Sequence, residues 1–320
     1  EGASLAAIAA EAGLNGPLEP WDWRRLAAGR RAGELDPEAA KPYLPLDRVI
    51  EAAFDVAGRL FGLSFEEVEG LALPHRDARA WEVRRDGAFL GLFVGDYFAR
   101  SSKRSGAWAS GLAPAQKLWE PGHPIILNTM NFARGDPTLL SPEDARTLFH
   151  EFGHALHGLM SEVTHPSISG TNVARDFVEL PSQLFEHWLT EPEILRAHAR
   201  HWRTGAPMPE DMIAALRAGD RQGQAFRTLE YLASALVDLE MHRLAPGAEA
   251  DPQALEHEVL ARIGMPRAIA MRHRSPHFLH VFAGAGYAAG YYSYLWSEVM
   301  DADAFNAFGE AGDPFDPDTA

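Results

Sequence analysis

The segment HEFGHALH, residues 150–157, constrains the fold most because its surroundings all favour one helix. Ser141 suits an N-cap, Pro142 suits the first helical position, and the acidic residues that follow suit the positive end of the helix dipole. A helix is therefore expected from residue 141 to about Gly158. At about 100° per residue, it separates an apolar face from a histidine face. The apolar face contains Leu148, Phe149, Phe152, Leu156 and Leu159, and the opposite face contains His150, His154 and His157.

The histidine face has the spacing of a metal site. His150 and His154 are four residues apart, so their rings lie one turn above the other and can converge on one zinc ion at about 2.0 to 2.1 Å. Glu151 lies beside this pair, where a carboxylate can reach an attacking water without binding the metal. His157 lies on the same face, so one alternative is that it supports a ligand from behind, but we expect it to be a structural histidine. The alternative for the whole motif is a helix with surface histidines.

A catalytic zinc needs a third protein ligand. A histidine six residues after His154 would be one solution, but position 160 is Met160. We therefore expect a glutamate from a second helix, in SGTNVARDFVELPSQLFEHW, with Ser169, Thr171 or Asn172 as its cap. Glu179 is the preferred ligand, because a carboxylate among Phe, Val, Leu and Pro is costly to bury without a cation.

Three other carboxylates lie near these residues in the sequence. Glu162 lies about two turns beyond His154 on the first helix and cannot turn back to the metal. Glu186 is possible but lies two turns after Glu179. Asp176 either caps the second helix, or pairs with Arg175, or accepts a hydrogen bond from a ligand histidine and orients it.

The rest of the 320-residue chain suggests a mainly helical protein with a small sheet. Residues 1–75 are expected to be helical and residues 141–320 to form a helical zinc-site region. Between them, residues 76–140 are expected to form a small sheet, with a hairpin over residues 80–98 that turns at Asp86-Gly87 and a strand over residues 124–130.

Composition excludes several classes of function. The chain has no cysteine, so histidine and carboxylate are its strong metal ligands and thiol catalysis is excluded. Its formal charge of −16 opposes binding to nucleic acid or an anionic membrane. No stretch has the length and apolar character of a membrane span. A cytoplasmic location is expected, because an absence of cysteine suits a reducing compartment.

HEFGHALH followed by Glu179 resembles the zinc peptidases of the thimet oligopeptidase family, most closely its bacterial peptidyl-dipeptidase and oligopeptidase A branch. The similarity extends over nearly the whole chain. It includes PWDWRR at 20–25, the segments 46–63 and 95–108, and HVFAGAGYAAGYYSYLWSEVMDADAF at 280–305. The resemblance implies a mainly α, zincin-like metallopeptidase with a small β-sheet beside the zinc-binding helix. Family members are about twice as long, so most of their N-terminal lobe is expected to be absent here.

The glycine- and tyrosine-rich segment 284–294 is a second candidate for chemistry. Glycine lets a loop approach a ligand closely, and phenols donate hydrogen bonds without charge near pH 7. The resemblance implies that Tyr287 and Tyr294 stabilise the oxyanion of amide hydrolysis and that His280 contacts the substrate or the same intermediate. Tyr291 and Tyr292 are expected to pack in the core instead.

The sequence thus predicts a zinc metallopeptidase with one Zn²⁺ per chain, held by His150, His154 and Glu179, and with Glu151 as general base. Short peptides are the expected substrates, bound in part along a sheet edge near residues 106–110, and C-terminal dipeptides are the expected product. The alternatives are internal cleavage, or a fragment that binds zinc and peptide without hydrolysis. A third alternative is a purely structural helical protein.

Release of C-terminal dipeptides requires a cation that binds the free C-terminal carboxylate of the substrate. Arg272, His273, Arg274 and His277 are the candidates, and the sequence does not select among them. Nor does it determine the oligomeric state.

Overall fold

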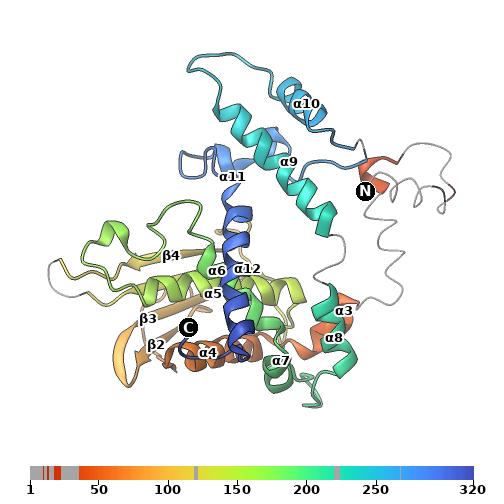
Figure 1. The fold of residues 1–320 in the computed structure, drawn as a ribbon. Coiled ribbons are helices and arrows are strands. Elements are labelled where there is room, and N and C mark those ends of the chain that lie inside the picture. The colour runs from red at the N-terminus through yellow and green to blue at the C-terminus, as the bar shows by residue number, and fades with distance from the viewer. Residues whose placement is uncertain are drawn as a thin grey trace. The chain divides into compact units, whose positions relative to one another are not determined.

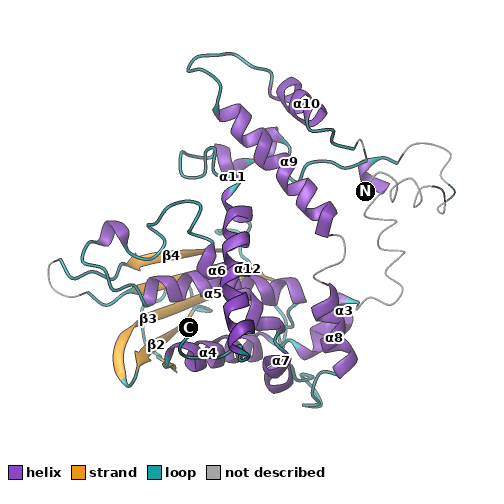
Figure 2. Ribbon diagram, viewed as in Figure 1, coloured by secondary structure: helices purple, strands orange, loops and turns teal. Residues whose placement is uncertain are grey.

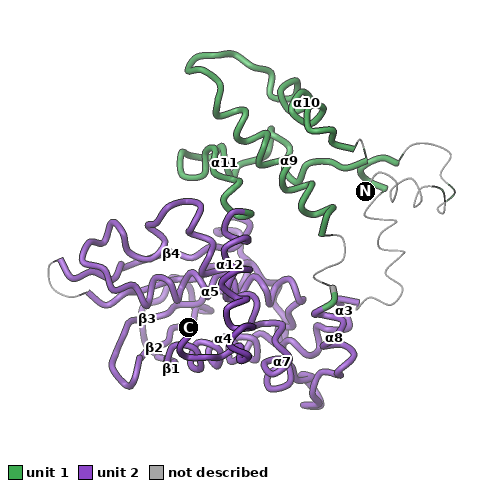
Figure 3. Tube along the Cα trace, in the orientation of Figure 1, with its two compact units in different colours: residues 1–35, 218–295 green, residues 36–217, 296–320 purple. Residues whose placement is uncertain are grey.

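The computed structural model describes residues 10, 13, 18–22, 36–118, 122–219, 224–266 and 268–320. The chain forms two compact units, one of residues 1–35 and 218–295 and one of residues 36–217 and 296–320 (Figure 3). Within the segment 1–75 that is expected to be helical, most residues before Asp36 lie outside the described residues. Helices outweigh strands (Figure 2), in agreement with the expected mainly helical fold with a small sheet.

The unit of residues 36–217 and 296–320 contains the sheet (Figure 1). Its α-helices are α3 (Pro37–Ala40), α4 (Leu46–Phe61), α5 (Pro142–Leu159), α6 (Leu180–Glu186), α7 (Pro192–His198) and most of α8 (Glu210–Gly219) and α12 (Ser293–Ala311). Its strands are β1 (Leu63–Glu67), β2 (Arg79–Arg85), β3 (Ala88–Phe98), β4 (Trp108–Ala113) and β5 (Ile125–Phe132). Short 3-10 helices are η1 (Lys41–Tyr43), η2 (Pro166–Ile168) and η3 (His187–Thr190).

The five strands have the order β1-β2-β3-β5-β4. All neighbours are antiparallel except β3 and β5, which are parallel. The predicted hairpin is confirmed as β2 and β3, and the predicted strand over residues 124–130 as β5. β1 falls in a region expected to be helical. There Gly62, at φ 67°, ends α4 in a left-handed conformation, and the alternating segment from Leu63 then pairs with β2.

The apolar face of α5 packs on this sheet, and α5 contacts β3, β4 and β5. Phe152 is 1% exposed and touches aromatic rings from four elements. These are Phe54 of α4, Phe65 of β1, Phe93 of β3 and Phe185 of α6. The predicted core face of the histidine helix is therefore the face that the protein buries.

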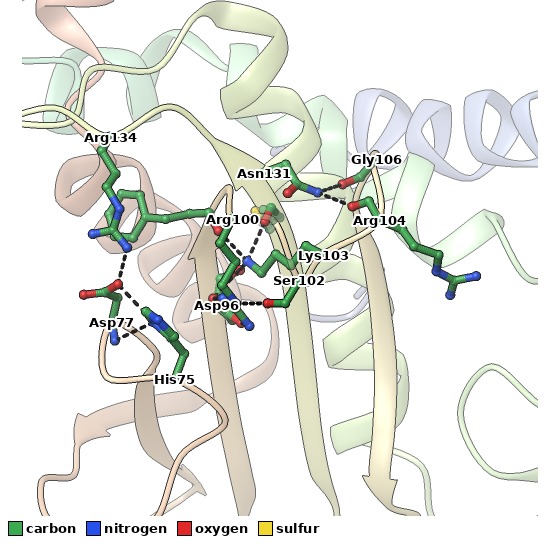
Figure 4. A network of polar contacts seen from close by, with 12 residues as sticks. His75, Asp77, Asp96, Arg100, Ser102, Lys103, Arg104, Gly106, Asn131 and Arg134 are labelled. Atoms are coloured by element: carbon green, nitrogen blue, oxygen red, sulfur yellow. Dashed lines mark hydrogen bonds and ion pairs between the residues drawn. The ribbon is translucent and has the colours of Figure 1, made fainter.

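A buried lysine organises the loop between β3 and β4 (Figure 4). Lys103 Nζ donates to the carbonyl oxygens of Asp96, Phe98 and Met130 at 2.7 to 2.8 Å and lies 2.9 Å from Asp96 Oδ1. Asn131 Nδ2 donates to the carbonyl oxygens of two residues later in the same loop, Arg104 and Gly106. These bonds set the path by which the chain enters β4.

The other unit contains α9 (Gln224–His242), α10 (Pro252–Arg262), the 3-10 helix η4 (Ser275–His277), α11 (Leu279–Phe282) and the first residues of α12. One of its cores joins α9 to the segment after α10 through Tyr231, Ala235, Phe278, Val281 and Tyr291. Over the described parts of the chain, no helix has both the length and the apolar character needed to cross a bilayer.

Candidate functional site

The histidine helix begins and ends close to where the sequence predicts. The Ser141 side chain accepts the Asp144 N–H at 3.1 Å, and the Asp144 carboxylate accepts the Ser141 N–H at 3.1 Å, which forms a capping box. α5 runs to Leu159, one residue beyond the expected end. His154 and Glu151 are buried, and His150 is partly exposed.

Glu179 does not lie inside a helix as expected. It occupies the N-cap position of α6, which begins at Leu180, ten or so residues after the proposed caps Ser169, Thr171 and Asn172. The preceding residues form turns, because glycine and the polar side chains there favour loop conformations over a helix. The side chain is nevertheless buried, at 2% exposure.

Gly153 allows the two helices to approach. A Cβ at this position of α5 would lie 2.6 Å from Pro181 O and 2.7 Å from Ser182 Cα, at the start of α6. Because glycine has no Cβ, the backbone of α6 lies directly against α5 beside His150 and His154. This contact brings Glu179 to the histidine pair.

The three predicted ligands meet. Glu179 Oε2 lies 3.3 Å from His150 Nε2 and 3.0 Å from His154 Nε2, and the candidate ligand atoms all lie within 4.8 Å of one another. Tetrahedral zinc with bonds of about 2.0 to 2.1 Å places its ligand atoms about 3.3 Å apart. Two imidazole nitrogens and one carboxylate therefore face a common point at suitable separations, and this group could hold a metal ion.

The electrostatics of the group reflect close pairing of acid and base. Burial opposes a charge on His150, but the adjacent Glu179 and Glu186 carboxylates outweigh it and raise the His150 pKa to about 10. Burial likewise disfavours a charged Glu179, but its hydrogen bonds to the two imidazoles hold the Glu179 pKa below its usual range. A carboxylate that stays ionised in a buried site is suited to bind a cation.

Glu186, rather than Asp176, hydrogen-bonds one of the candidate ligand histidines. Glu186 Oε1 accepts from His150 Nδ1 at 2.6 Å, while its other oxygen pairs with Arg146 Nε at 2.5 Å. Glu186 is the last residue of α6, two turns after Glu179, and it faces α5 as Glu179 does. The Asp176 carbonyl instead accepts a hydrogen bond from Ser297 Oγ at 2.9 Å.

Glu151 has the environment of a buried base. It is 5% exposed, and burial raises its pKa. Among the described residues, no atom hydrogen-bonds its Oε2. A buried carboxylate oxygen without a partner is costly, so this oxygen is suited to bind a water or a substrate group. His157 lies 6.4 Å from the Phe177 ring, and burial lowers its pKa, which fits a neutral packing residue.

The predicted residues of the second loop gather within the other unit. Tyr294 Oη lies 3.0 Å from His280 Nε2, and the His280 ring lies 4.5 Å from the Tyr287 ring. Tyr291 packs in the core as expected, at 4% exposure. Tyr292, which was also expected to pack, is 36% exposed.

Among the four candidate cations for the substrate carboxylate, two are poorly suited to that role. Arg274 Nε pairs with the buried Glu256 carboxylate. Burial lowers the pKa of His273, which disfavours the charged form of its ring. Arg272 is exposed and hydrogen-bonds the Tyr291 side chain, which lies beside the tyrosines of the second loop.

Comparison with known proteins identifies related peptidases. Residues 2–319 match Peptidase family M3. The chain is 40% identical over 304 residues to a dipeptidyl carboxypeptidase of Escherichia coli, covering 92% of this chain and 44% of that protein. It is 36% identical over 326 residues to oligopeptidase A of E. coli, covering 97% and 47% respectively. A mitochondrial intermediate peptidase 2 of Cryptococcus neoformans is 30% identical over 304 residues, covering 82% and 37%. The chain thus spans less than half the length of these relatives.

Proposed function

Because the chain belongs to Peptidase family M3, a family of metallopeptidases, we propose that it is a zinc peptidase of zincin-like fold that cleaves short peptides and releases C-terminal dipeptides. The observation that carries the proposal is the convergence of His150, His154 and Glu179 on one point, with Glu151 buried beside them. The relative that is 40% identical, named a dipeptidyl carboxypeptidase, supports dipeptide release. Internal cleavage is the second candidate, favoured by the oligopeptidase A relative.

In this proposal, His150, His154 and Glu179 hold the zinc and Glu186 fixes the His150 ring. The ion supplies a Lewis acid and lowers the pKa of water to about 7. Glu151 accepts a proton from the attacking water and later delivers it to the leaving amine. Its raised pKa suits this role, because a base is most effective when its pKa approaches the working pH.

The peptide is proposed to bind along β4. This strand pairs only with β5 in the described sheet, and it contacts the histidine helix. Trp108–Ser110, the later part of the predicted edge, belongs to β4, whereas Gly106 and Ala107 precede it. Backbone hydrogen bonds to an added strand depend little on side chains, which suits an enzyme acting on varied peptides.

Tyr287 and Tyr294 are proposed to donate hydrogen bonds to the oxyanion that forms during amide hydrolysis, with His280 beside them. One such donor contributes roughly 3 kcal/mol to lowering the barrier. Support comes from the family resemblance of their segment and from their clustering in the structure.

The test compares Glu151→Gln with Glu162→Gln, a matched change at an exposed carboxylate after the same helix. Turnover of an internally quenched peptide should be lost only in E151Q, while both variants retain one zinc per chain by elemental mass spectrometry. Full turnover by E151Q would exclude the proposed base. Mass spectrometry of the digested peptide distinguishes dipeptide release from internal cleavage, and added chelator should stop either reaction.

A further inference from the structure

The loop that bears Tyr287 is held in a strained turn. The Tyr287 carbonyl accepts the Gly290 N–H at 2.9 Å, so Ala288 and Ala289 are the central residues of a four-residue turn. Ala289 has φ 54°, a left-handed conformation that glycine normally occupies at this turn position. A side chain with a Cβ pays about 1 to 2 kcal/mol there. Other contacts must therefore hold the turn closed.

Those contacts come from Asp238 on α9. Its side chain is fully buried, at 0% exposure. Oδ1 accepts the Ala289 N–H at 3.1 Å, and Oδ2 accepts the Tyr291 N–H at 3.0 Å. His242 Nδ1 lies 2.8 Å from Oδ1. One carboxylate thus binds the backbone on both sides of Gly290 and fixes the turn that directly follows Tyr287.

We propose that Asp238 is a positioning residue of the peptidase reaction: it fixes the turn through Ala289 and Tyr291 and so orients the Tyr287 hydroxyl. This inference rests on the proposed function, in which Tyr287 is an oxyanion donor. Asp238 touches no reacting atom in this role. It acts through the loop backbone, and its distance from Tyr287 in sequence explains why no motif indicated it.

A carboxylate is needed because two separate N–H groups bind two separate oxygens. Asparagine at 238 would keep one acceptor and direct an NH₂ group toward the other N–H, where it repels rather than binds. The turn then loses one anchor while Ala289 remains strained. Misplacing a catalytic group by about 1 Å costs on the order of 100-fold in rate, so Asp238→Asn should lower kcat by roughly 10- to 100-fold.

The matched control is Glu256→Gln. Glu256 is a second buried carboxylate of the same unit, at 1% exposure, and it accepts from Ser275 N and Oγ at 3.2 and 3.0 Å. It fixes a different loop. Both variants should lose thermal stability, but only D238N should lose kcat, with KM nearly unchanged. An equal loss of kcat in E256Q would reduce the role of Asp238 to general stability and overturn the proposal.

The decisive measurement is a double-mutant cycle with Tyr287→Phe, made on the zinc-loaded protein. If Asp238 acts through Tyr287, adding D238N to Y287F should lower kcat by less than about twofold further. If the kcat losses of D238N and Y287F instead multiply in the double variant, the inference is overturned. If Y287F is impaired but D238N has wild-type kcat, only the inference about Asp238 is wrong. Wild-type kcat in Y287F would also remove the tyrosine from the proposed function.

A second variant keeps the test decisive if D238N does not fold. Ala289→Val leaves α9 and its core unchanged but places a β-branched residue at φ 54°, which strongly disfavours the turn. Its kcat should fall by roughly 10-fold, following the same reasoning about orientation. Wild-type kcat in A289V would show that the turn does not set the position of Tyr287.

Discussion

Replacing Gly153 by alanine tests the contact that joins the two halves of the proposed metal site. The new Cβ would lie 2.6 Å from Pro181 O, 2.7 Å from Ser182 Cα and 3.1 Å from Phe185 Cβ. The first two are backbone atoms, so no side-chain rotation relieves the clash. Since ordinary contact begins at 3.4 Å, α6 must move away from α5 by roughly 0.7 to 0.8 Å.

Such a movement is large for a metal site. Glu179 directly precedes α6 and would move with it, whereas metal–ligand distances tolerate about 0.2 Å. Zinc affinity should therefore fall by at least the 10- to 100-fold that altering an outer partner of a ligand costs. Unfolding free energy should change less, because about 1 to 3 kcal/mol of overpacking is offset by about 1 kcal/mol of helix propensity gained from glycine to alanine.

The control is Gly158→Ala in the same helix. Its Cβ would meet Ile126 Cδ1 at 2.6 Å, the flexible end of a side chain that can turn aside. Competition with a chromogenic chelator gives the zinc Kd of each variant, with Glu179→Ala as the reference for a lost ligand. G153A should approach E179A, and G158A should resemble wild type. Wild-type zinc affinity in G153A would refute the reasoning that glycine is what brings Glu179 to the histidines.

Three further results are expected. Glu186→Gln should weaken zinc binding by roughly 10- to 100-fold in the same chelator assay, because it weakens the acceptor of His150; an unchanged Kd would remove Glu186 from the site. Lys103→Met should cost about 3 to 5 kcal/mol in urea unfolding, since it leaves three carbonyls and the buried Asp96 carboxylate without the ammonium; a loss no larger than that of the exposed-pair variant Arg196→Met would contradict this. Burial disfavours ionised Asp96, but hydrogen bonds from Arg100 and Lys103 hold its pKa below the usual range. The stability that the Asp96 carboxylate contributes is therefore present above pH of about 4 and is lost as the pH falls through its folded-state pKa. Asp96→Asn should flatten this acid dependence of the unfolding free energy.

Local sequence determined the histidine helix and its pair of candidate metal ligands. A capping serine, a proline at the first turn and an apolar stripe are signals that act within a few residues, so they predict α5 to within a residue of its end. The pairing of His150 with His154 follows from helix geometry alone. The same holds for the β2–β3 hairpin, whose turn lies between two alternating segments.

The supports of the site were less visible in the sequence. Asp176 and Glu186 are both carboxylates within a few residues of Glu179, and only the direction of α6 decides that Glu186 reaches His150. Asp238 is a single acid within a helical pattern, and its bonds to a loop some fifty residues away leave no local trace. Lys103 lies in the segment 95–108, which showed only a family resemblance. The signal that could have found it is Asp96, because an aspartate within an apolar strand indicates a buried cation nearby.

The amino-acid sequence by itself determined that His150 and His154 lie side by side, because residues four apart on a helix always share a face. Only the tertiary structure decided that Glu179 begins a helix rather than lying within one, and that Gly153 lets this helix approach the histidines. The physical reason is that spacing within a helix is fixed by its own hydrogen bonds. The distance between α5 and α6 instead depends on which side chain is missing between them.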